Sequence, residues 1–292
     1  MAGNARRTRP TTPARSGSQA GTDAANALTG RHPIDTGTAD LQVDPSDPDG
    51  FLLSVNDVPS SYVHADPTRL DFEYMQWLAD VLEAWEPAPA PLKVTHIGGA
   101  GCTMARYVAA TRPGSTQVVY EVDGALATLA RQAFGLKQVA GVRIRAEDGR
   151  SGLAGAPAGV ADVVIRDAFA GALVPPHLST TGWLNVVRTA LVPAGLYVAN
   201  VADQTQLALA RREAVTAAAA FRNVALVAEP GQLRGRRYGN VVLLASDAAL
   251  PAQALTRRLA SGAVRARYVP PARVAELTSG QALLVDRVVD QD

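Results

Sequence analysis

This sequence of 292 residues has one cysteine, Cys102, a net charge of +1 and no long apolar run. A lone cysteine excludes an internal disulfide and a cysteine-rich metal site, and it is consistent with a reducing, cytoplasmic setting. A net charge near zero provides no overall field to attract nucleic acid or an anionic membrane. No apolar segment approaches the roughly 20 residues that a helix needs to span a bilayer. We therefore expect neither nucleic acid nor membrane as a partner.

Two common catalytic signatures are also missing. The sequence contains no Gly-x-Ser-x-Gly elbow of a serine hydrolase and no Gly-Lys-Ser/Thr phosphate loop. The histidines are scattered without the spacing of metal ligands, so no metal site is expected. One of them, His177, precedes a predicted helix near the expected site and is a candidate substrate contact or base.

The first part of the chain has almost no large apolar residues. Residues 1–45 are rich in Thr, Ala, Gly, Ser, Pro and Arg, a composition that cannot bury enough surface to offset the entropy of ordering. We predict a disordered tail there. Residues 46–91 are predicted to form a small β domain, with a hairpin that turns at Asn56-Asp57, followed by a helix that ends in a proline-rich linker.

The remaining chain alternates short apolar runs with helix-compatible segments. This alternation predicts a doubly wound, mostly parallel sheet of the Rossmann type, closed by an antiparallel hairpin. We expect this core over residues 92–250 and a C-terminal extension over residues 251–292. The predicted core strands are 94–97, 117–122, 142–145, 161–165, 196–201, 223–228 and 240–245, and the predicted helices include 103–111, 125–134, 180–191, 204–220 and 252–260.

The first two core strands carry the most informative motif. The first ends in a cluster of glycines, a helix-compatible segment follows, and the second strand ends in two acidic residues. Small residues let the backbone approach a ligand, and an acid at the second strand end accepts hydrogen bonds from ribose hydroxyls. The alternatives are a tight turn and a solvated strand end. We favour an adenosine-type ligand, held by Gly98, Gly99, Gly101, Glu121 and Asp123.

Further carboxylates follow the later strands and are expected at the same edge of the sheet. Asp148 is followed by Gly149 in a loop and could hold an adenine amino group, although Asp-Gly is also a common turn. Asp167 directly ends the fourth strand, where a carboxylate has no packing role, and it is the main catalytic candidate. Its alternative role is a cap for the next helix, which is also how we interpret Asp203.

These residues together resemble the spermidine synthase (polyamine aminopropyltransferase) family, in which a small N-terminal β domain precedes a methyltransferase-like Rossmann core. The resemblance extends from Leu52 to Ala245. It implies that Glu121 binds the ribose, Asp148 the adenine, and that Asp167 is catalytic. It also implies decarboxylated S-adenosylmethionine or S-adenosylmethionine as co-substrate, no tightly bound cofactor, small-molecule substrates and a homodimer.

The chain departs from the family pattern in the acceptor half of the site. Gly101 and Ala170 stand where the family carries aspartates, the first of which holds the charged end of the donor. On the predicted N-terminal helix, Tyr74 is the expected substrate contact, while the glutamate that accompanies it in the family is displaced to Glu73. Polyamines are multiply cationic, and several carboxylates normally compensate for their desolvation.

Three functions remain open at this point. The first, which we favour, is an aminopropyltransferase-like enzyme in which Asp167 orients the acceptor amine and helps to deprotonate it. The second is a methyltransferase that uses S-adenosylmethionine, with the N–H groups of residues 99–101 receiving its carboxylate. The third is a non-catalytic nucleoside-binding or dimer-forming module that has lost polyamine turnover.

Overall fold

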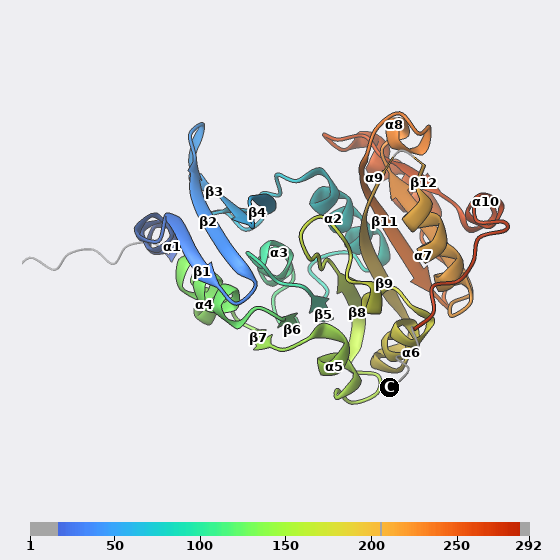
Figure 1. Ribbon diagram of the computed structural model, residues 1–292, viewed down its shortest axis with the longest axis horizontal. Helices are drawn as coiled ribbons and strands as arrows, with labels where there is room; N and C mark the ends of the chain where they lie inside the picture. Colours follow the sequence, from blue (N-terminus) through green and yellow to red (C-terminus); the bar gives the residue numbers. More distant parts are fainter. Residues whose placement is uncertain (1–16, 205, 287–292) are drawn as a thin grey trace, which may run out of the picture.

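Two β-sheets and their helices form the structure, a computed structural model that describes residues 17–204 and 206–286. A four-stranded antiparallel sheet comes first in the chain, and an eight-stranded sheet follows it. Figure 1 shows the small sheet at one side of the molecule and the large sheet beside it. The predicted fold class, a small N-terminal β unit followed by a doubly wound, mostly parallel core, is confirmed.

The small sheet is larger than the predicted hairpin. Strands β3 and β4 form that hairpin, and its turn residues Asn56 and Asp57 are both left-handed (φ 51° and 63°), as a tight two-residue hairpin turn requires. Strands β1 and β2 add a second hairpin. The bounds are β1 Gly30–Ile34, β2 Gly37–Asp44, β3 Asp47–Val55 and β4 Val58–His64.

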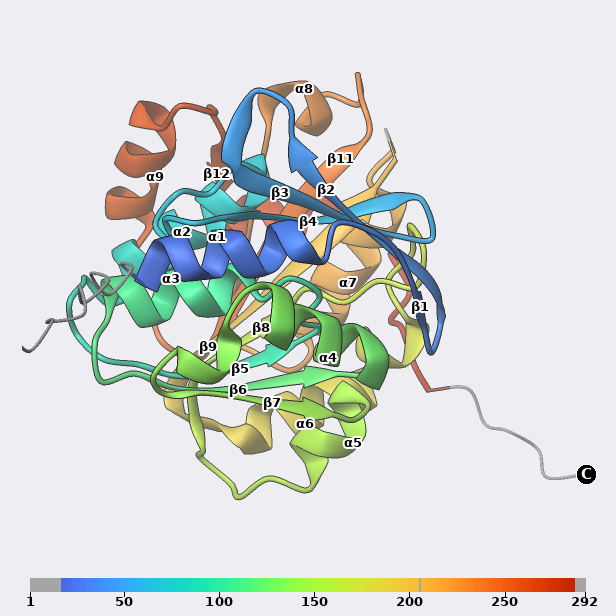
Figure 2. The ribbon, with the colours of Figure 1, turned by 90° about the vertical axis from the view of Figure 1, so that its left-hand side faces the viewer.

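The expectation of a disordered tail is wrong for residues 17–45, while residues 1–16 lie outside the described part of the chain. Helix α1 (Gly17–Ala27), β1 and β2 occupy this segment. Figure 2 shows α1 beside α4 (Gly124–Ala133). The buried apolar side chains here are few, namely Ala25, Ile34, Ala39 and Leu41, so composition alone did not reveal the order.

The large sheet has the strand order β12-β10-β11-β9-β8-β5-β6-β7. Strands β9, β8, β5, β6 and β7 run parallel, and β11, β10 and β12 continue the sheet in antiparallel fashion. The short strand β12 was not predicted, and it joins the residues after 251 to the core sheet. The bounds are β5 Lys93–Ile97, β6 Thr116–Glu121, β7 Val142–Ala146, β8 Ala161–Arg166, β9 Leu191–Asp203, β10 Asn223–Ala228, β11 Gly239–Ser246 and β12 Arg267–Val269.

Helices bury both faces of this sheet, because successive side chains of a strand point to opposite faces and both sets are apolar. In β8, Val163 and Ile165 pack on one face and Val164 on the other. The first face is covered by α2 (Glu73–Trp85), α3 (Thr103–Thr111) and α9 (Ala252–Ser261). The second is covered by α5 (Gly149–Ala154), α6 (Thr181–Ala190), α7 (Ala208–Ala218) and α10 (Pro271–Leu277).

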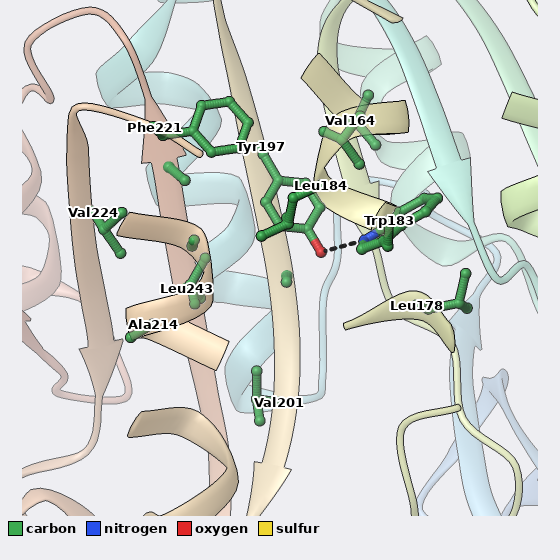
Figure 3. Close-up of a cluster of buried hydrophobic side chains, with 14 of the residues drawn as sticks. Val164, Leu178, Trp183, Leu184, Tyr197, Val201, Ala214, Phe221, Val224 and Leu243 are labelled. Atoms are coloured by element: carbon green, nitrogen blue, oxygen red, sulfur yellow. Dashed lines mark hydrogen bonds between the residues drawn. The ribbon is translucent and has the colours of Figure 1, made fainter. Parts of the chain in front are cut away.

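The second face contains a polar contact within its apolar cluster. Figure 3 shows the Trp183 indole nitrogen donating a hydrogen bond to the Tyr197 hydroxyl, 3.0 Å away, among buried aliphatic side chains. Buried Trp and Tyr usually find such partners, because an unpaired polar group in a core is costly. None of the helices in the described residues has the length and hydropathy needed to span a bilayer.

A buried carboxylate, that of Asp123, attaches the small sheet to the core. Its Oδ1 accepts hydrogen bonds from the backbone N–H of Leu126 in α4 (2.7 Å) and of Asp35 in the β1–β2 turn (3.2 Å). Its Oδ2 accepts from the backbone N–H and the hydroxyl of Thr36, both at 2.7 Å. These four donors occupy the oxygens that we predicted to bind a nucleoside. The structure therefore assigns Asp123 an anchoring role in place of the predicted one.

The anchor depends on the charge of Asp123. Burial by itself raises the pKa of this carboxyl, but the hydrogen bonds from Leu126, Thr36 and Asp35 outweigh burial and hold the pKa below its ordinary value of 3.8. Because the folded pKa lies below the unfolded one, this stabilisation is present above pH 3.8 and is lost as the pH falls through the folded pKa.

We predict that Asp123→Ala lowers the free energy of unfolding by about 2–4 kcal/mol, because it removes a helix cap and leaves buried donors unpaired. Urea denaturation at neutral pH measures the loss. Asp49→Ala is the control, since the Asp49 side chain is exposed and should change little. The difference between wild type and Asp123→Ala should shrink below pH 3.8. Equal stability of the two variants would contradict the anchoring role.

Candidate active site

A cavity of about 1740 Å³ opens at the carboxyl ends of the parallel strands. Its walls come from the β3–β4 turn, the start of α2, the loops after β5, β6, β8 and β9, and the segment before β11. Every predicted site residue except Gly101 lines this cavity. These residues are Tyr74, Gly98, Gly99, Glu121, Asp123, Asp148, Gly149, Asp167 and His177.

The glycine-rich loop between β5 and α3 presses against the end of β8. Gly98 has a φ of +90°, and a Cβ at this position would lie 2.2 Å from the backbone oxygen of Asp167. In return, the Asp167 backbone N–H donates to the Ile97 carbonyl at 2.8 Å. Only glycine satisfies both the left-handed backbone and the close approach. The loop and the predicted catalytic residue are therefore held together by their backbones.

Glu121 lies beneath this loop with 8% of its surface exposed. Its Oε2 accepts hydrogen bonds from the backbone N–H groups of Gly99 (2.8 Å) and Ala100 (3.0 Å), and its Oε1 accepts from that of Asp123 (3.1 Å). A carboxylate offers about four acceptor positions. Three are used by the backbone, so Glu121 shapes the loop and retains one position for a further donor at the cavity wall.

Asp148 and His177 form a second polar group of the cavity. Asp148 caps α5 by accepting from the Ser151 N–H (3.0 Å), and its other oxygen lies 2.8 Å from His177 Nε2. Burial raises the pKa of Asp148, but the hydrogen bonds from Ser151 and His177 outweigh it and lower the pKa. In the described structure His177 contacts Asp148, and its predicted role as a substrate contact or base stays a prediction.

Asp167 accepts hydrogen bonds from two side chains, of which only one was predicted to belong to the site. The Tyr74 hydroxyl donates to its Oδ2 (3.1 Å), and the Asn200 side-chain amide donates to its Oδ1 (2.8 Å). Tyr74 was predicted as a substrate contact, whereas Asn200 received no role. The signal for Asn200 was a polar residue within the fifth apolar run, near its carboxyl end. The two donors fix the orientation of the carboxylate toward the cavity.

The pKa values fit a carboxyl that can take up a proton. Burial raises the pKa of Asp167, while the hydrogen bonds from Asn200 and Tyr74 and the charge of Arg166 reduce that rise. Burial, together with the neighbouring Asp167, raises the pKa of Tyr74 well above 10, so its hydroxyl stays protonated and donates. A carboxyl with a raised pKa is better matched to proton transfer near neutral pH than an ordinary aspartate.

A fully buried ion pair lies directly behind Asp167. Arg166, the preceding residue, points to the opposite face, where its Nη2 donates to Glu213 Oε2 in α7 (2.7 Å) and to the Asn200 carbonyl (3.2 Å). Burial lowers the pKa of Arg166, but Glu213 more than compensates, so the guanidinium stays charged. The pair thus holds the backbone of Asn200, whose side-chain amide donates to Asp167.

Gly101 does not take part in the cavity. Its backbone N–H donates to Ser61 Oγ in β4 (3.1 Å), and a Cβ there would lie 2.5 Å from Val63 Cγ2 and 2.9 Å from Ser61 Cβ. These contacts direct Gly101 toward the small sheet, and its predicted role as a nucleoside contact stays a prediction. The aspartate that the resemblance implies at this position would meet the side chains of Ser61 and Val63.

Asp203 acts as a helix cap in the described structure. Its Oδ2 accepts a hydrogen bond from the Ala210 N–H in the first turn of α7, at 2.7 Å. This agrees with the interpretation of Asp203 as a cap.

We predict that Glu213→Ala destabilises the protein by about 3–5 kcal/mol, because it leaves a buried guanidinium without its counter-charge. The double variant Arg166→Met/Glu213→Leu should recover most of this loss, since it removes both charges. Denaturant unfolding measures each variant. The exposed pair Arg273–Glu276 is the control, and Glu276→Ala should cost less than about 1 kcal/mol. A double variant no more stable than Glu213→Ala would show that the charge pairing is not the cause.

Comparison with known proteins finds chains that are similar in sequence and in structure. None of the protein-family models matches the sequence. A probable spermidine synthase from Corynebacterium glutamicum has 36% sequence identity and a TM-score of 0.84, over 91% of this chain and 99% of that chain. The polyamine aminopropyltransferase of Vibrio vulnificus is 27% identical over 149 residues, which span 50% of this chain and about half (48%) of that protein.

Part of the chain is also similar to a methyltransferase fold. Human methyltransferase-like protein 13 superimposes with a TM-score of 0.50 and 23% identity, over 66% of this chain and 94% of that chain. This likeness concerns the fold only. The likeness to the Corynebacterium protein, in contrast, extends over nearly the whole of both chains at 36% identity. The chain therefore belongs to the spermidine synthase-like family.

Proposed function

We propose that the protein transfers an aminopropyl group from decarboxylated S-adenosylmethionine to an amine. The observation that carries this proposal is the Asp167 carboxylate, held by Tyr74 and Asn200 at one wall of the cavity whose neighbouring wall is the glycine-rich loop. The names of the Corynebacterium and Vibrio relatives support the same reaction class.

The donor half of the site would use residues of the β5, β6 and β7 strand ends. Glu121 has an acceptor position left for a ribose hydroxyl, and Asp148 is placed to receive an adenine amino group once His177 shares its oxygen. The backbone of Gly98 and Gly99 leaves space at the cavity wall that a side chain would fill. These assignments are the ones that the resemblance implies.

In the reaction, the nitrogen lone pair of the amine attacks the methylene carbon next to the sulfonium. A carbon–nitrogen bond forms as the carbon–sulfur bond breaks, and its electron pair stays on sulfur, so neutral methylthioadenosine leaves. Asp167 accepts the proton that the acceptor ammonium gives up to free this lone pair, and it passes the proton to solvent after the product, itself an ammonium, has left. Tyr74 and Asn200 keep the carboxylate in one orientation, so most of the rate enhancement would come from proximity and alignment.

A second candidate, methyl transfer from S-adenosylmethionine, is favoured by one observation. The aspartate that would hold the amine of the decarboxylated donor is replaced by Gly101, and β4 fills its place. A donor that keeps its carboxylate does not need that aspartate. The third reading, a binding module without turnover, is an outcome of the tests below. The homodimer and the cytoplasmic location stay predictions.

Thermal unfolding with each donor separates the candidates. Decarboxylated S-adenosylmethionine and methylthioadenosine should each stabilise the protein by about 2.7 kcal/mol at 100 times their dissociation constants. S-adenosylmethionine should stabilise it less at the same concentration. The strongest stabilisation by S-adenosylmethionine would favour the methyltransferase, and no stabilisation by any of the three would contradict the nucleoside site.

We predict that Asp167→Asn lowers kcat about 100- to 10,000-fold while donor affinity is unchanged, because the amide keeps the shape but cannot accept the proton. Release of methylthioadenosine measures turnover. Wild-type activity should rise with pH through the raised pKa of Asp167, since only the ionised form is a base, so the acidic limb should lie above pH 3.8. Asp162→Asn, at the opposite end of β8, is the control. Unchanged turnover in Asp167→Asn would refute the catalytic assignment, and donor binding without turnover in wild type would favour the binding module.

A further inference from the structure

We propose that the acceptor is an amine whose far end carries an anionic group, bound by Arg236 at the mouth of the cavity, and not a polyamine with ammonium groups at both ends. This inference rests on the proposed function, because it names the chemical class of the second substrate of the same site.

The positive charge at the mouth comes from the segment between α8 (Pro230–Leu233) and β11. Arg236 and Arg237 both line the cavity, whereas Arg234 of the same segment does not. Arg237 is paired with Glu229, with 2.8 Å between Nη1 and Oε2. Within the part of the chain that the structure describes, the Arg236 side chain makes no hydrogen bond and no ion pair. Arg236 therefore brings to the cavity a positive charge that no described side chain pairs.

Most carboxylates of the cavity are already used by the protein. Asp123, Asp148 and Asp203 each accept backbone hydrogen bonds that hold a turn or a helix start, and Glu121 holds the glycine-rich loop. The carboxylates of the cavity that accept no backbone hydrogen bond to their side chains are those near Tyr74. They are Asp167, which contacts the Tyr74 hydroxyl, and the exposed Asp71 and Glu73, which closely precede Tyr74 in the chain.

The acids that accept no backbone hydrogen bond thus lie at the start of α2 and after β8, and the unpaired arginine lies in the segment before β11. The reacting amine belongs at the acidic end, beside Asp167. A linear polyamine that extends toward the mouth would bring a second ammonium near Arg236, and such like-charge contacts act against binding. A carboxylate at that end would instead form a charge-assisted, bidentate hydrogen bond with the guanidinium.

The mouth is also apolar. Val122, Leu173 and Tyr238 line the cavity and are 64%, 71% and 79% exposed. They are three of the five strongly exposed large apolar side chains in the described residues, which concentrates such surface at one place. A volume of about 1740 Å³ exceeds the roughly 300–1,000 Å³ of ordinary ligand pockets and leaves room beyond a nucleoside donor. We infer that an apolar chain joins the amine of the acceptor to its anionic end.

Matched acceptors test the inference. Straight-chain diamines and amino acids with the amine at the far end, each with four, six or eight carbons, differ only in whether the distal group is ammonium or carboxylate. Release of methylthioadenosine from the decarboxylated donor gives kcat/KM. We expect the best amino acid to exceed the diamine of equal length at least tenfold. Arg236→Ala should remove that advantage by weakening the amino acids alone, and Arg234→Ala should not change it.

A binding readout keeps this test separate from that of the reaction. The same compounds are titrated by calorimetry into protein saturated with methylthioadenosine, so the preference for an anionic end is measured without turnover. Tighter binding of the amino acids, lost in Arg236→Ala, supports the inference even if no acceptor reacts, in which case only the proposed function fails. A preference for diamines, no binding of any amino acid, or a loss of donor affinity in Arg236→Ala would each overturn the inference.

Discussion

The close contact between the glycine-rich loop and the end of β8 is the constraint on which the site depends. Gly98 approaches the Asp167 backbone so closely that no side chain fits between them, and the Asp167 N–H is bonded to the Ile97 carbonyl. The glycine-rich loop and the residue that we propose as catalytic are therefore held together by their backbones. Pre-organisation of this kind reduces the movement needed to bring two reactants into alignment.

Two other parts of the cavity do not share this contact. The small sheet presses Ser61 and Val63 against Gly101, which removes the space for an acidic side chain near the donor. At the opposite end, the segment before β11 contributes arginine to the same cavity. Neither feature belongs to the hydrogen-bonded group of Asp167, Tyr74 and Asn200. The proposed reacting centre and the proposed contacts to a second substrate therefore lie on different parts of the fold.

The sequence revealed the parallel core because buried strands are continuous apolar runs, which is why β5 to β8 were predicted to within a residue or two. It also revealed the carboxylates at the strand ends, because topology places those ends together. It failed at β2, where the alternation of Ala39, Leu41 and Val43 with polar residues was present but was masked by the polar composition around it. The pairing of Arg166 with Glu213 joins residues far apart in the chain, and the filling of the space at Gly101 depends on tertiary packing. Neither has a local signal.

The second hairpin has a consequence for where the folded unit begins. Strand β2 pairs along β3 from Ala39 to Asp44, and it covers a strand that carries the buried side chains of Phe51 and Leu53. A chain shortened to start at residue 46 would lose Thr36 and keep the other residues that line the cavity. It would, however, turn β3 into an exposed edge with unpaired N–H and C=O groups beside an apolar surface. Such edges pair with strands of other molecules, so the shortened protein would tend to aggregate, although it would still contain Asp167, Tyr74 and Asn200.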